Sequence, residues 1–158
     1  MRMIRSLRDL PPIVVPEGYR LRPYRVGDEE AWARLMNAAF ATEEKKTTPM
    51  ERASFEKEYP LSGGCDRNWI LFAEQIEDGA LVGTTTAWEA DLEGKRMGLV
   101  HWVAVEPAHR GRGLGEALLA ASLHAMRDRG HTEAFLNTDA LLRAAVRLYE
   151  RMGFERMP

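Results

Sequence analysis

The spacing of apolar residues changes repeatedly along the chain, and each change marks a predicted element. In some segments apolar residues recur every three or four positions, which predicts helices with one buried face. In others they are contiguous or alternate with polar residues, which predicts strands. The predicted helices span 29–40, about 48–59, 114–129 and about 140–152. The predicted strands span 19–24, 68–74, 81–88, 98–105 and 134–137.

Residue types that favour helix ends and turns flank these segments. Asp28, Thr48 and Asp139 lie where an N-cap is expected, because each side chain has an oxygen that can accept a hydrogen bond from a free helix amide. Gly130 and Gly153 lie where helices are expected to stop, because glycine readily adopts the left-handed conformation that ends a helix. The Glu-Asp-Gly sequence between the second and third predicted strands indicates a tight hairpin turn.

The order of the elements predicts one layered α/β domain over residues 1–158. The segment 98–105 is apolar on both faces, which is typical of a strand at the centre of a sheet. A loop is expected before it, over 91–95. The strand 134–137 runs parallel to the central strand if the helix between them is a crossover. Residues 1–18 contain three prolines and are expected to form an extended N-terminal arm or edge segment.

Composition agrees with one ordinary globular domain. The 158 residues are 45% hydrophobic and 29% charged, which indicates neither disorder nor a disulfide-rich scaffold. The net charge of −2 gives no general attraction to nucleic acid or to an anionic membrane, and no apolar run approaches the length of a membrane span. Cys65 is the single cysteine, so we expect no disulfide and no metal site. No secretory signal is recognisable, and a cytoplasmic protein is expected.

The turn between the central strand and the helix 114–129 is the segment that most suggests chemistry. Its glycines allow a ligand to approach the main chain closely. The helix leaves its first amides unpaired and directs the positive end of its dipole to the same place, which suits a phosphate. Arg110 and Arg112 add positive charge, although a glycine-bearing turn that only begins a helix is the alternative. Glu116 replaces the third glycine of a dinucleotide fingerprint, and the Gly-Lys-Ser/Thr of a Walker loop is absent.

Two motifs follow one another in the C-terminal third of the chain. The first is Arg-x-x-Gly-x-Gly, formed by Arg110, Gly113 and Gly115 after a Val-Ala-Val strand. The second is Ala-x-x-Leu-Tyr-x-x-x-Gly-Phe, which matches residues 145–154. In this order and separation they resemble the GNAT superfamily of N-acetyltransferases. The resemblance implies a GNAT fold, in which a mixed, mostly antiparallel sheet is splayed between two parallel strands and flanked by helices.

The resemblance also implies acetyl-CoA as the cofactor, bound in the split between the strands at Val103 and Phe135. The pantetheine arm would pair with the backbone of the central strand, and an amide there would polarise the thioester carbonyl. Amides of the glycine-rich turn would hold the pyrophosphate. The cofactor-binding residues implied in this way are Val103, Ala104, Val105, Arg110, Gly111, Arg112, Gly113, Leu114, Gly115 and Glu116.

Tyr149 is the catalytic residue that the second motif implies, as the proton donor to the departing thiolate. A tyrosine pKa near 10 lies above the value of about 8.5 for a thiol, so the neutral hydroxyl is available at pH 7. An aromatic residue that only packs against the last helix is the alternative. Phe154 is expected to fold back on Tyr149 or Leu148.

A general base must take a proton from the acceptor amine, and several residues are candidates. His101 lies on the central strand, on the face that it shares with Val103, and is the catalytic candidate that we name. The alternative is a histidine whose hydrogen bonds are satisfied within the core. Glu74, Glu89 and Asp91, on or beside strands that could line the cleft, are further candidates.

Two features depart from the family pattern. Many members carry asparagine seven residues before the tyrosine, where this chain has Leu142, so Asn137 or Asp139 is the candidate substitute at the cofactor. The chain also ends too soon after the second motif for the usual C-terminal strand pair. We expect the exposed sheet edge beyond 134–137 to be covered by the N-terminal arm, by a shortened strand over 154–157, or by a second subunit in a homodimer.

These features predict an acetyl-CoA-dependent N-acetyltransferase that transfers an acetyl group to a primary amine of a small molecule. The transfer is expected to occur by direct attack in a ternary complex. The resemblance implies that the first two predicted helices lie on the acceptor side of the cleft. A protein N-terminal or lysine acetyltransferase is the alternative within the same class of enzymes. A non-catalytic acyl-CoA-binding module with a regulatory role is the alternative from a different class.

Overall fold

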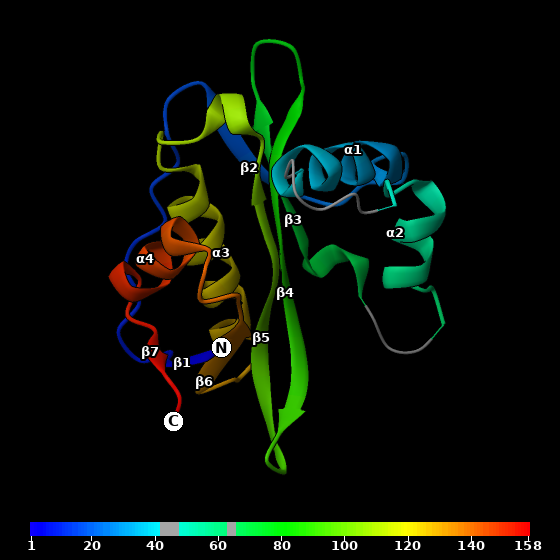
Figure 1. Cartoon of the computed structure of the whole chain (residues 1–158). Coiled ribbons are helices and arrows are strands. Elements are labelled where there is room, and N and C mark those ends of the chain that lie inside the picture. Colours follow the sequence, from blue (N-terminus) through cyan, green and yellow to red (C-terminus); the bar gives the residue numbers. More distant parts are fainter. Residues whose placement is uncertain (42–47, 63–65) are drawn as a thin grey trace.

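The computed structural model describes residues 1–41, 48–62 and 66–158, so Cys65 lies outside the described residues (Figure 1). The strands are β1 Arg2–Ser6, β2 Tyr19–Pro23, β3 Ile70–Gln75, β4 Leu81–Leu92, β5 Lys95–Val105, β6 Glu133–Asn137 and β7 Glu155–Arg156. The helices are α1 Glu29–Phe40, α2 Arg52–Glu58, α3 Leu114–Asp128 and α4 Arg143–Arg151, with 3₁₀ turns at Arg67–Trp69 and Pro107–His109. Within these ranges the strands form one seven-stranded sheet in the order β2-β3-β4-β5-β6-β1-β7.

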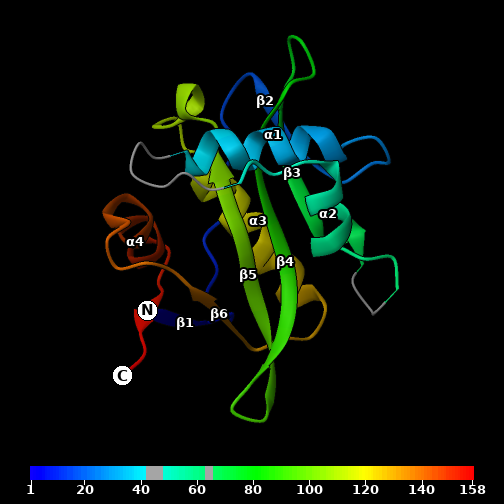
Figure 2. The same ribbon diagram turned by 45° about the vertical axis from the view of Figure 1, so that its right-hand side comes forward.

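The described helices lie in two layers, one on each face of the sheet (Figures 1 and 2). On one face, α1 and α2 bury Trp32 and Phe55 against Phe72 of β3. On the other face, Leu123 of α3 and Met152 after α4 belong to a second apolar cluster with residues of β1, β5 and β6. This arrangement confirms the predicted mixed α/β fold. None of the described helices combines the length and the apolar character needed to cross a bilayer.

β4 and β5 form a long hairpin that extends further than the sequence predicts. Pairing continues to Leu92 opposite Lys95, so the expected loop over 91–95 is wrong. Only Glu93 and Gly94 form the turn, with φ values of 51° and 80°. Positive φ at both central residues is typical of the tight turns that match the twist of a hairpin. The prediction of a central strand is confirmed, since β5 lies between β4 and β6.

β5 and β6 are parallel, and their pairing is brief. Gly98 lies beside Ala134 and Leu99 lies beside Phe135, after which no further pair forms between these two described strands. Further along β5, Trp102 has a φ of 55°, and the register with β4 shifts at the same place. Such a bulge bends a strand and redirects its side chains. The split between the parallel strands therefore opens beyond the pair of Leu99 and Phe135, on the side of Val103.

Both ends of the chain cover the sheet edge beyond β6. β1 pairs antiparallel with β6, from Arg2 opposite Asn137 to Ser6 opposite Glu133. β7 then pairs with β1 on its other side. The arm and a shortened final strand thus occupy this edge together, and the strand is shorter than the expected 154–157. This removes the reason for expecting a second subunit there, and the homodimer stays a prediction.

The carboxylates predicted to cap α1 and α4 form other bonds. Asp28 precedes α1, but its side chain accepts hydrogen bonds from the guanidinium of Arg22 at 2.8 and 3.0 Å. Asp139 accepts from the amide of Leu141 at 2.9 Å, and α4 begins later, at Arg143. Asp28 therefore occupies the predicted N-cap position of α1 without capping it through its side chain, and the N-cap prediction for Asp139 is wrong. In both cases a nearby cation or turn amide takes the oxygen that an isolated helix would use.

The remaining helix ends differ in how well local sequence predicts them. α2 starts after a capping box in which Glu51 and Ser54 exchange side-chain and backbone hydrogen bonds, so the predicted cap at Thr48 is wrong. Gly130 and Gly153 have φ values of 93° and 80° and lie just beyond α3 and α4. Their prediction as helix stops is confirmed. Phe154 also folds back as expected, with its ring 6.1 Å from that of Tyr149.

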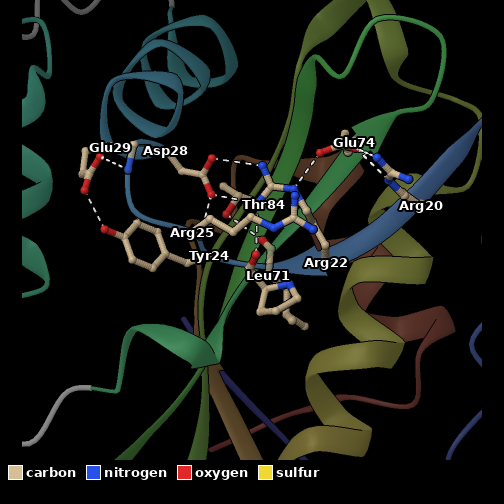
Figure 3. Close-up of polar contacts among 11 residues, drawn as sticks. Arg20, Arg22, Tyr24, Arg25, Asp28, Glu29, Leu71, Glu74 and Thr84 are labelled. Atoms are coloured by element: carbon tan, nitrogen blue, oxygen red, sulfur yellow. Dashed lines mark hydrogen bonds and ion pairs between the residues drawn. The ribbon is translucent and has the colours of Figure 1, made fainter.

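A polar cluster fixes the start of α1 against β2 and β3 (Figure 3). Arg22 lies between two carboxylates, with Nε 2.6 Å from Glu74 and Nη1 2.8 Å from Asp28. The Tyr24 hydroxyl donates to Glu29 in the first turn of the helix. Glu74 is 4% exposed, and its pKa is lowered mainly because Arg22 donates to it. The ionised carboxylates in this cluster therefore support the scaffold.

Candidate active site

A cavity of about 670 Å³ opens between the end of β5, the start of α3 and the first turns of α4. It is closed on a further side by Ala39 and Phe40 at the end of α1. The lining includes most of the residues predicted to bind the cofactor or to act in catalysis: Val103, Ala104, Val105, Arg110, Gly111, Gly113, Leu114, Gly115, Glu116 and Tyr149. The predicted residues His101, Arg112 and Asn137 are outside this lining.

The glycine-rich turn exposes main-chain donors to this cavity. Gly111 and Gly113 have φ values of 75° and 90°, so the turn needs residues that tolerate the left-handed conformation. α3 then begins without a side-chain cap. Within the described residues, the amides of Leu114, Gly115 and Glu116 have no hydrogen-bond acceptor. Three free N–H groups and the positive end of the helix dipole form a site that fits a diphosphate such as that of coenzyme A.

The two arginines of this turn donate hydrogen bonds to oxygen atoms of the protein itself. Arg110 lines the cavity, but its guanidinium donates to the carbonyl oxygens of Val105 and Ala39 at 3.0 and 2.9 Å. It thereby ties the end of β5 to the last turn of α1. Arg112 donates to the hydroxyl of Tyr19 at 3.1 Å. The amides of the turn are therefore free to bind a ligand, while both guanidinium groups fix the turn's position.

Tyr19 links this turn to β2 and also orients a histidine of the lining. Its hydroxyl lies 2.7 Å from Nδ1 of His109, which lines the cavity. The hydroxyl accepts from the guanidinium of Arg112, which can only donate, and shares a second hydrogen bond with Nδ1 of His109. Sequence reasoning missed this group, because Tyr19 and His109 are 90 residues apart.

The end of β5 presents its backbone to the split between the parallel strands. The amide of Glu106 donates to the carbonyl of Val82 in β4 at 2.8 Å, and hydrogen bonding alternates along an antiparallel strand. Val103 and Val105 therefore direct their backbone groups away from β4, toward the side from which β6 has diverged. The bond from Arg110 to the carbonyl of Val105 agrees with this orientation. An extended ligand can pair with this edge as an additional strand would.

Tyr149 lies on α4 and contributes a buried aromatic ring to the cavity wall. It is 8% exposed, and burial raises the pKa of its hydroxyl. Among the described residues, no group hydrogen-bonds that hydroxyl, while the ring makes an edge contact with Phe154. The side chain is thus held by packing, with its proton available to a group in the cavity.

His101 faces the α1 and α2 side of the sheet, where it meets a residue that sequence reasoning did not select. Its Nε2 lies 2.6 Å from Oε1 of Glu58, the last residue of α2. Trp102 donates from Nε1 to the same oxygen at 2.9 Å. The pKa of Glu58 is lowered, chiefly by the hydrogen bond with His101. Because Glu58 and His101 are 43 residues apart, no local pattern in the sequence indicates this pair.

The other candidate bases have basic partners elsewhere. Glu74 lies in the cluster of Figure 3, where it pairs with Arg20 and Arg22. Glu89 lies 2.8 Å from Arg96 and 3.0 Å from His131, and Asp91 lies 3.7 Å from Arg96. These three carboxylates are outside the cavity lining. Their positions favour structural roles over proton transfer at the cavity.

The asparagine that the family pattern leads one to expect is replaced by an apolar side chain in the cavity wall. Leu142 lines the cavity at the position where many family members carry asparagine. Asn137 accepts a hydrogen bond from Nε of Arg2 at 3.2 Å, so its side chain joins β6 to β1. Asp139 is taken by the turn before α4. Neither candidate substitute is therefore directed to the cavity, and the role of Asn137 at the cofactor stays a prediction.

The sequence matches a known protein family, and the fold and the cavity agree with that match. The sequence profile of the Acetyltransferase (GNAT) family matches residues 30–154, and the chain belongs to this family. The matched range includes β3 to β6, the glycine-rich turn and α4. GNAT acetyltransferases use acetyl-CoA, which agrees with the cofactor expected from the free amides of α3.

Curated relatives match nearly the whole chain. It is 35% identical to a mycothiol acetyltransferase of Kytococcus sedentarius, in a match that covers 94% of this chain and 49% of the relative. It is 40% identical to a mycothiol acetyltransferase of Thermobispora bispora, with 98% and 53% covered. The chain thus spans about half the length of the curated relatives it matches.

Solved structures show the same fold. A GCN5-related N-acetyltransferase from Sphaerobacter thermophilus superposes with a TM-score of 0.76 at 30% identity, covering 98% of this chain and 47% of that one. The aminoglycoside N-acetyltransferase AAC(6')-Iy, solved in complex with CoA, superposes with a TM-score of 0.69 at 18% identity, covering 92% and 94%. At this identity the second likeness concerns the fold alone.

Proposed function

We propose that this chain is an acetyl-CoA-dependent N-acetyltransferase that acetylates the primary amine of a small molecule by direct attack in a ternary complex. The observation that carries the proposal is the start of α3, where three amides that find no acceptor among the described residues border a cavity that Tyr149 also lines. A site for a diphosphate and a protonated hydroxyl therefore share one cavity. Membership of the GNAT family supports the same conclusion.

The chain's residues bind and orient the cofactor, which supplies an acetyl group on an activated thioester. The amides of Leu114, Gly115 and Glu116 bind the pyrophosphate, since a helix N-terminus stabilises negative charge. The backbone of Val103 and Val105 offers donors and acceptors to the amide groups of the pantetheine arm. A backbone N–H of this strand would supply a hydrogen bond to the thioester carbonyl and would stabilise negative charge on its oxygen.

Tyr149 protonates the departing sulfur. Its pKa is raised by burial, so the hydroxyl stays protonated at neutral pH and above the value of about 8.5 at which an ordinary thiol ionises. Proton transfer from the phenol to a thiolate is then possible at the pH where the enzyme works. The absence of a described protein partner for this hydroxyl supports the role, because nothing else in the described chain uses the proton.

The proposed acceptor class is a small molecule with a primary amine. Relatives that match nearly the whole chain are named for mycothiol, which supports a small molecule over a protein substrate. A protein acetyltransferase and a non-catalytic acyl-CoA-binding module remain alternatives that the assay below separates.

The test is to mix the purified chain with acetyl-CoA and single acceptors, and to measure release of free CoA thiol. We expect thiol release that depends on a small amine, with one acetylated amine per thiol by mass spectrometry. The chain incubated with acetyl-CoA alone should gain no acetyl mass, since transfer is direct. Turnover with peptides alone would favour a protein acetyltransferase. Calorimetric binding of CoA without turnover would favour the module, and the absence of binding would contradict the proposal.

A further inference from the structure

One oxygen of Glu58 receives hydrogen bonds from two consecutive residues of β5. His101 Nε2 lies 2.6 Å from Oε1, and Trp102 Nε1 donates to the same atom at 2.9 Å. The next residue of the strand, Val103, lines the cofactor cavity. A carboxylate on the α2 side of the sheet is thus fixed beside the strand segment along which the thioester is proposed to lie.

The hydrogen bonds determine which ring nitrogen of His101 can accept a proton. An ionised carboxylate only accepts hydrogen bonds, and the pKa of Glu58 is lowered, chiefly by its bond with His101. Nε2 therefore carries the proton in this pair, and in the neutral imidazole the lone pair is on Nδ1. Among the residues that the structure describes, no group hydrogen-bonds Nδ1. The ring is held by one nitrogen and has the other free for a proton.

The surroundings of the pair allow a substrate to reach it. The side chains of His101 and Glu58 are 30% and 33% exposed, so neither is sealed in the core. The ring centroids of Trp102 and His101 are 5.1 Å apart. The ring centroids of Trp102 and Phe40 are 5.8 Å apart, and Phe40 lines the cofactor cavity. Aromatic rings thus connect the pair to the cavity, and such rings attract a cation.

The charged and titratable groups around the imidazole are few. Trp88 of β4 makes an edge contact at 5.4 Å and is uncharged. Tyr59, next to Glu58 in the chain, has its hydroxyl 2.8 Å from the hydroxyl of Thr86. Glu58 is thus the ionised group in direct contact with His101 among the described residues. An imidazolium formed here is stabilised by that carboxylate.

We propose that His101 is the general base that takes the proton of the acceptor's ammonium group, and that Glu58 is the positioning residue that fixes its tautomer. The acceptor class is then a primary amine that reaches the enzyme as a cation. This inference rests on the proposed acetyl transfer. It assigns a role to a carboxylate that the sequence did not indicate.

The proton balance of the reaction closes with one proton released. His101 accepts one proton at Nδ1 from the ammonium and passes it to solvent. The neutral amine forms the C–N bond while the C–S bond breaks, and the sulfur leaves with its electron pair and takes the proton of the Tyr149 hydroxyl. The surplus proton on the acylated nitrogen returns through water to Tyr149. Each residue ends the cycle in its starting state.

The first test compares Glu58→Gln with Glu56→Gln in the thiol-release assay. Glutamine at residue 58 keeps an oxygen for Trp102 but removes the charge. We expect kcat/KM to fall about tenfold or more, the acid limb of the pH–rate profile to move to lower pH, and CoA affinity to be unchanged. Glu56 lies on the same helix as Glu58 and pairs with Arg67 of the following 3₁₀ turn, so its variant controls for general effects on α2. Unchanged kcat/KM and an unchanged pH profile in Glu58→Gln would overturn the inference.

A second test does not depend on the folding of a variant. Nitrogen-15 spectra of the unaltered chain report which imidazole nitrogen of His101 carries the proton. We expect a protonated Nε2 and an unprotonated Nδ1 at neutral pH, and His101→Gln should lower kcat/KM about 100-fold or more. The opposite tautomer, or full activity in His101→Gln, would overturn the inference. Absence of CoA binding or turnover in the unaltered chain would contradict the proposed function itself, which separates the two failures.

Discussion

The two sides of the candidate active site are built in different ways. The cofactor side is one continuous segment, from the end of β5 through the glycine-rich turn to the first turn of α3, and its donors are backbone amides. The proposed acceptor side depends on Glu58 and His101, which come from different layers and lie 43 residues apart. Backbone donors arise wherever a helix begins, whereas a side-chain pair exists only after the chain has folded.

The same contrast explains why the sequence predicts that the arginines of the turn bind phosphate. Charge and spacing pointed to a ligand, but Arg110 bonds to the end of α1 and to Val105, and Arg112 bonds to Tyr19. In the folded chain, these cations satisfy carbonyl and hydroxyl groups that other segments bring to them. The amides are the part of the turn whose availability follows from local structure alone.

The largest effect is expected for Tyr149→Phe, which tests the chemistry of the cavity without disturbing its walls. The change removes a hydroxyl that has no partner among the described residues, so packing against Phe154 should persist. Loss of the proton donor should lower kcat about 100-fold or more, while CoA affinity stays close to that of the unaltered chain. Steady-state kinetics and calorimetry measure the two quantities. An unchanged kcat would show that the ring only packs.

Gly113→Val tests the local character of the cofactor side. A β-branched residue is strained at a φ of 90°, so the turn should shift and weaken CoA binding about tenfold, measured by calorimetry. Gly79→Val is the matched control, since Gly79 has a φ of 72° in a hairpin turn outside the cavity lining. The control should lose stability and keep its CoA affinity. Equal affinities in both variants would contradict the assignment of the turn.

Tyr19→Phe gives a smaller effect on the same side. It removes the hydroxyl between Arg112 and His109, a loss of about 1 kcal/mol of positioning energy, so CoA affinity should fall about fivefold. Tyr24→Phe is the control, because it removes a hydroxyl bonded to Glu29 in the scaffold cluster of Figure 3. The hypothesis fails if both variants bind CoA as the unaltered chain does.

Glu74→Gln should leave kinetics unchanged and alter only stability. The pKa of Glu74 is lowered from 4.5 in the folded chain, mainly by its hydrogen bond from Arg22. The ionised carboxylate therefore contributes fully to the free energy of unfolding at a pH above its pKa in the unfolded chain. This contribution is lost as the pH falls through its lower pKa in the folded chain. The free energy of unfolding of the variant should be about 3 kcal/mol lower than that of the unaltered chain at pH 7, and this difference should become smaller in acid. Denaturant titrations at several pH values measure this. A loss of kcat in the folded variant would contradict a purely structural role.

Local sequence predicted much of the fold. The period of apolar residues located the four helices and the central strand, because burial of one face selects that period. Glycine located the ends of α3 and α4, since few other residues adopt positive φ. Asp28 precedes α1 as predicted, but its side chain bonds to Arg22. The N-cap predictions at Thr48 and Asp139 are wrong because other local bonds form there, a capping box of Glu51 with Ser54 and a bond from the Leu141 amide to Asp139.

The sequence by itself determined the family, the strand-turn-helix that exposes three amides, and the placement of Tyr149 in a motif of the last helix. Each of these rests on contacts within a few residues, where spacing along the chain fixes geometry. Only the tertiary structure decided that both chain ends cover the sheet edge, that the arginines of the turn hold protein atoms, and that Glu58 meets His101. Those contacts join segments far apart in the chain, and their distances are set by how the helices pack on the sheet.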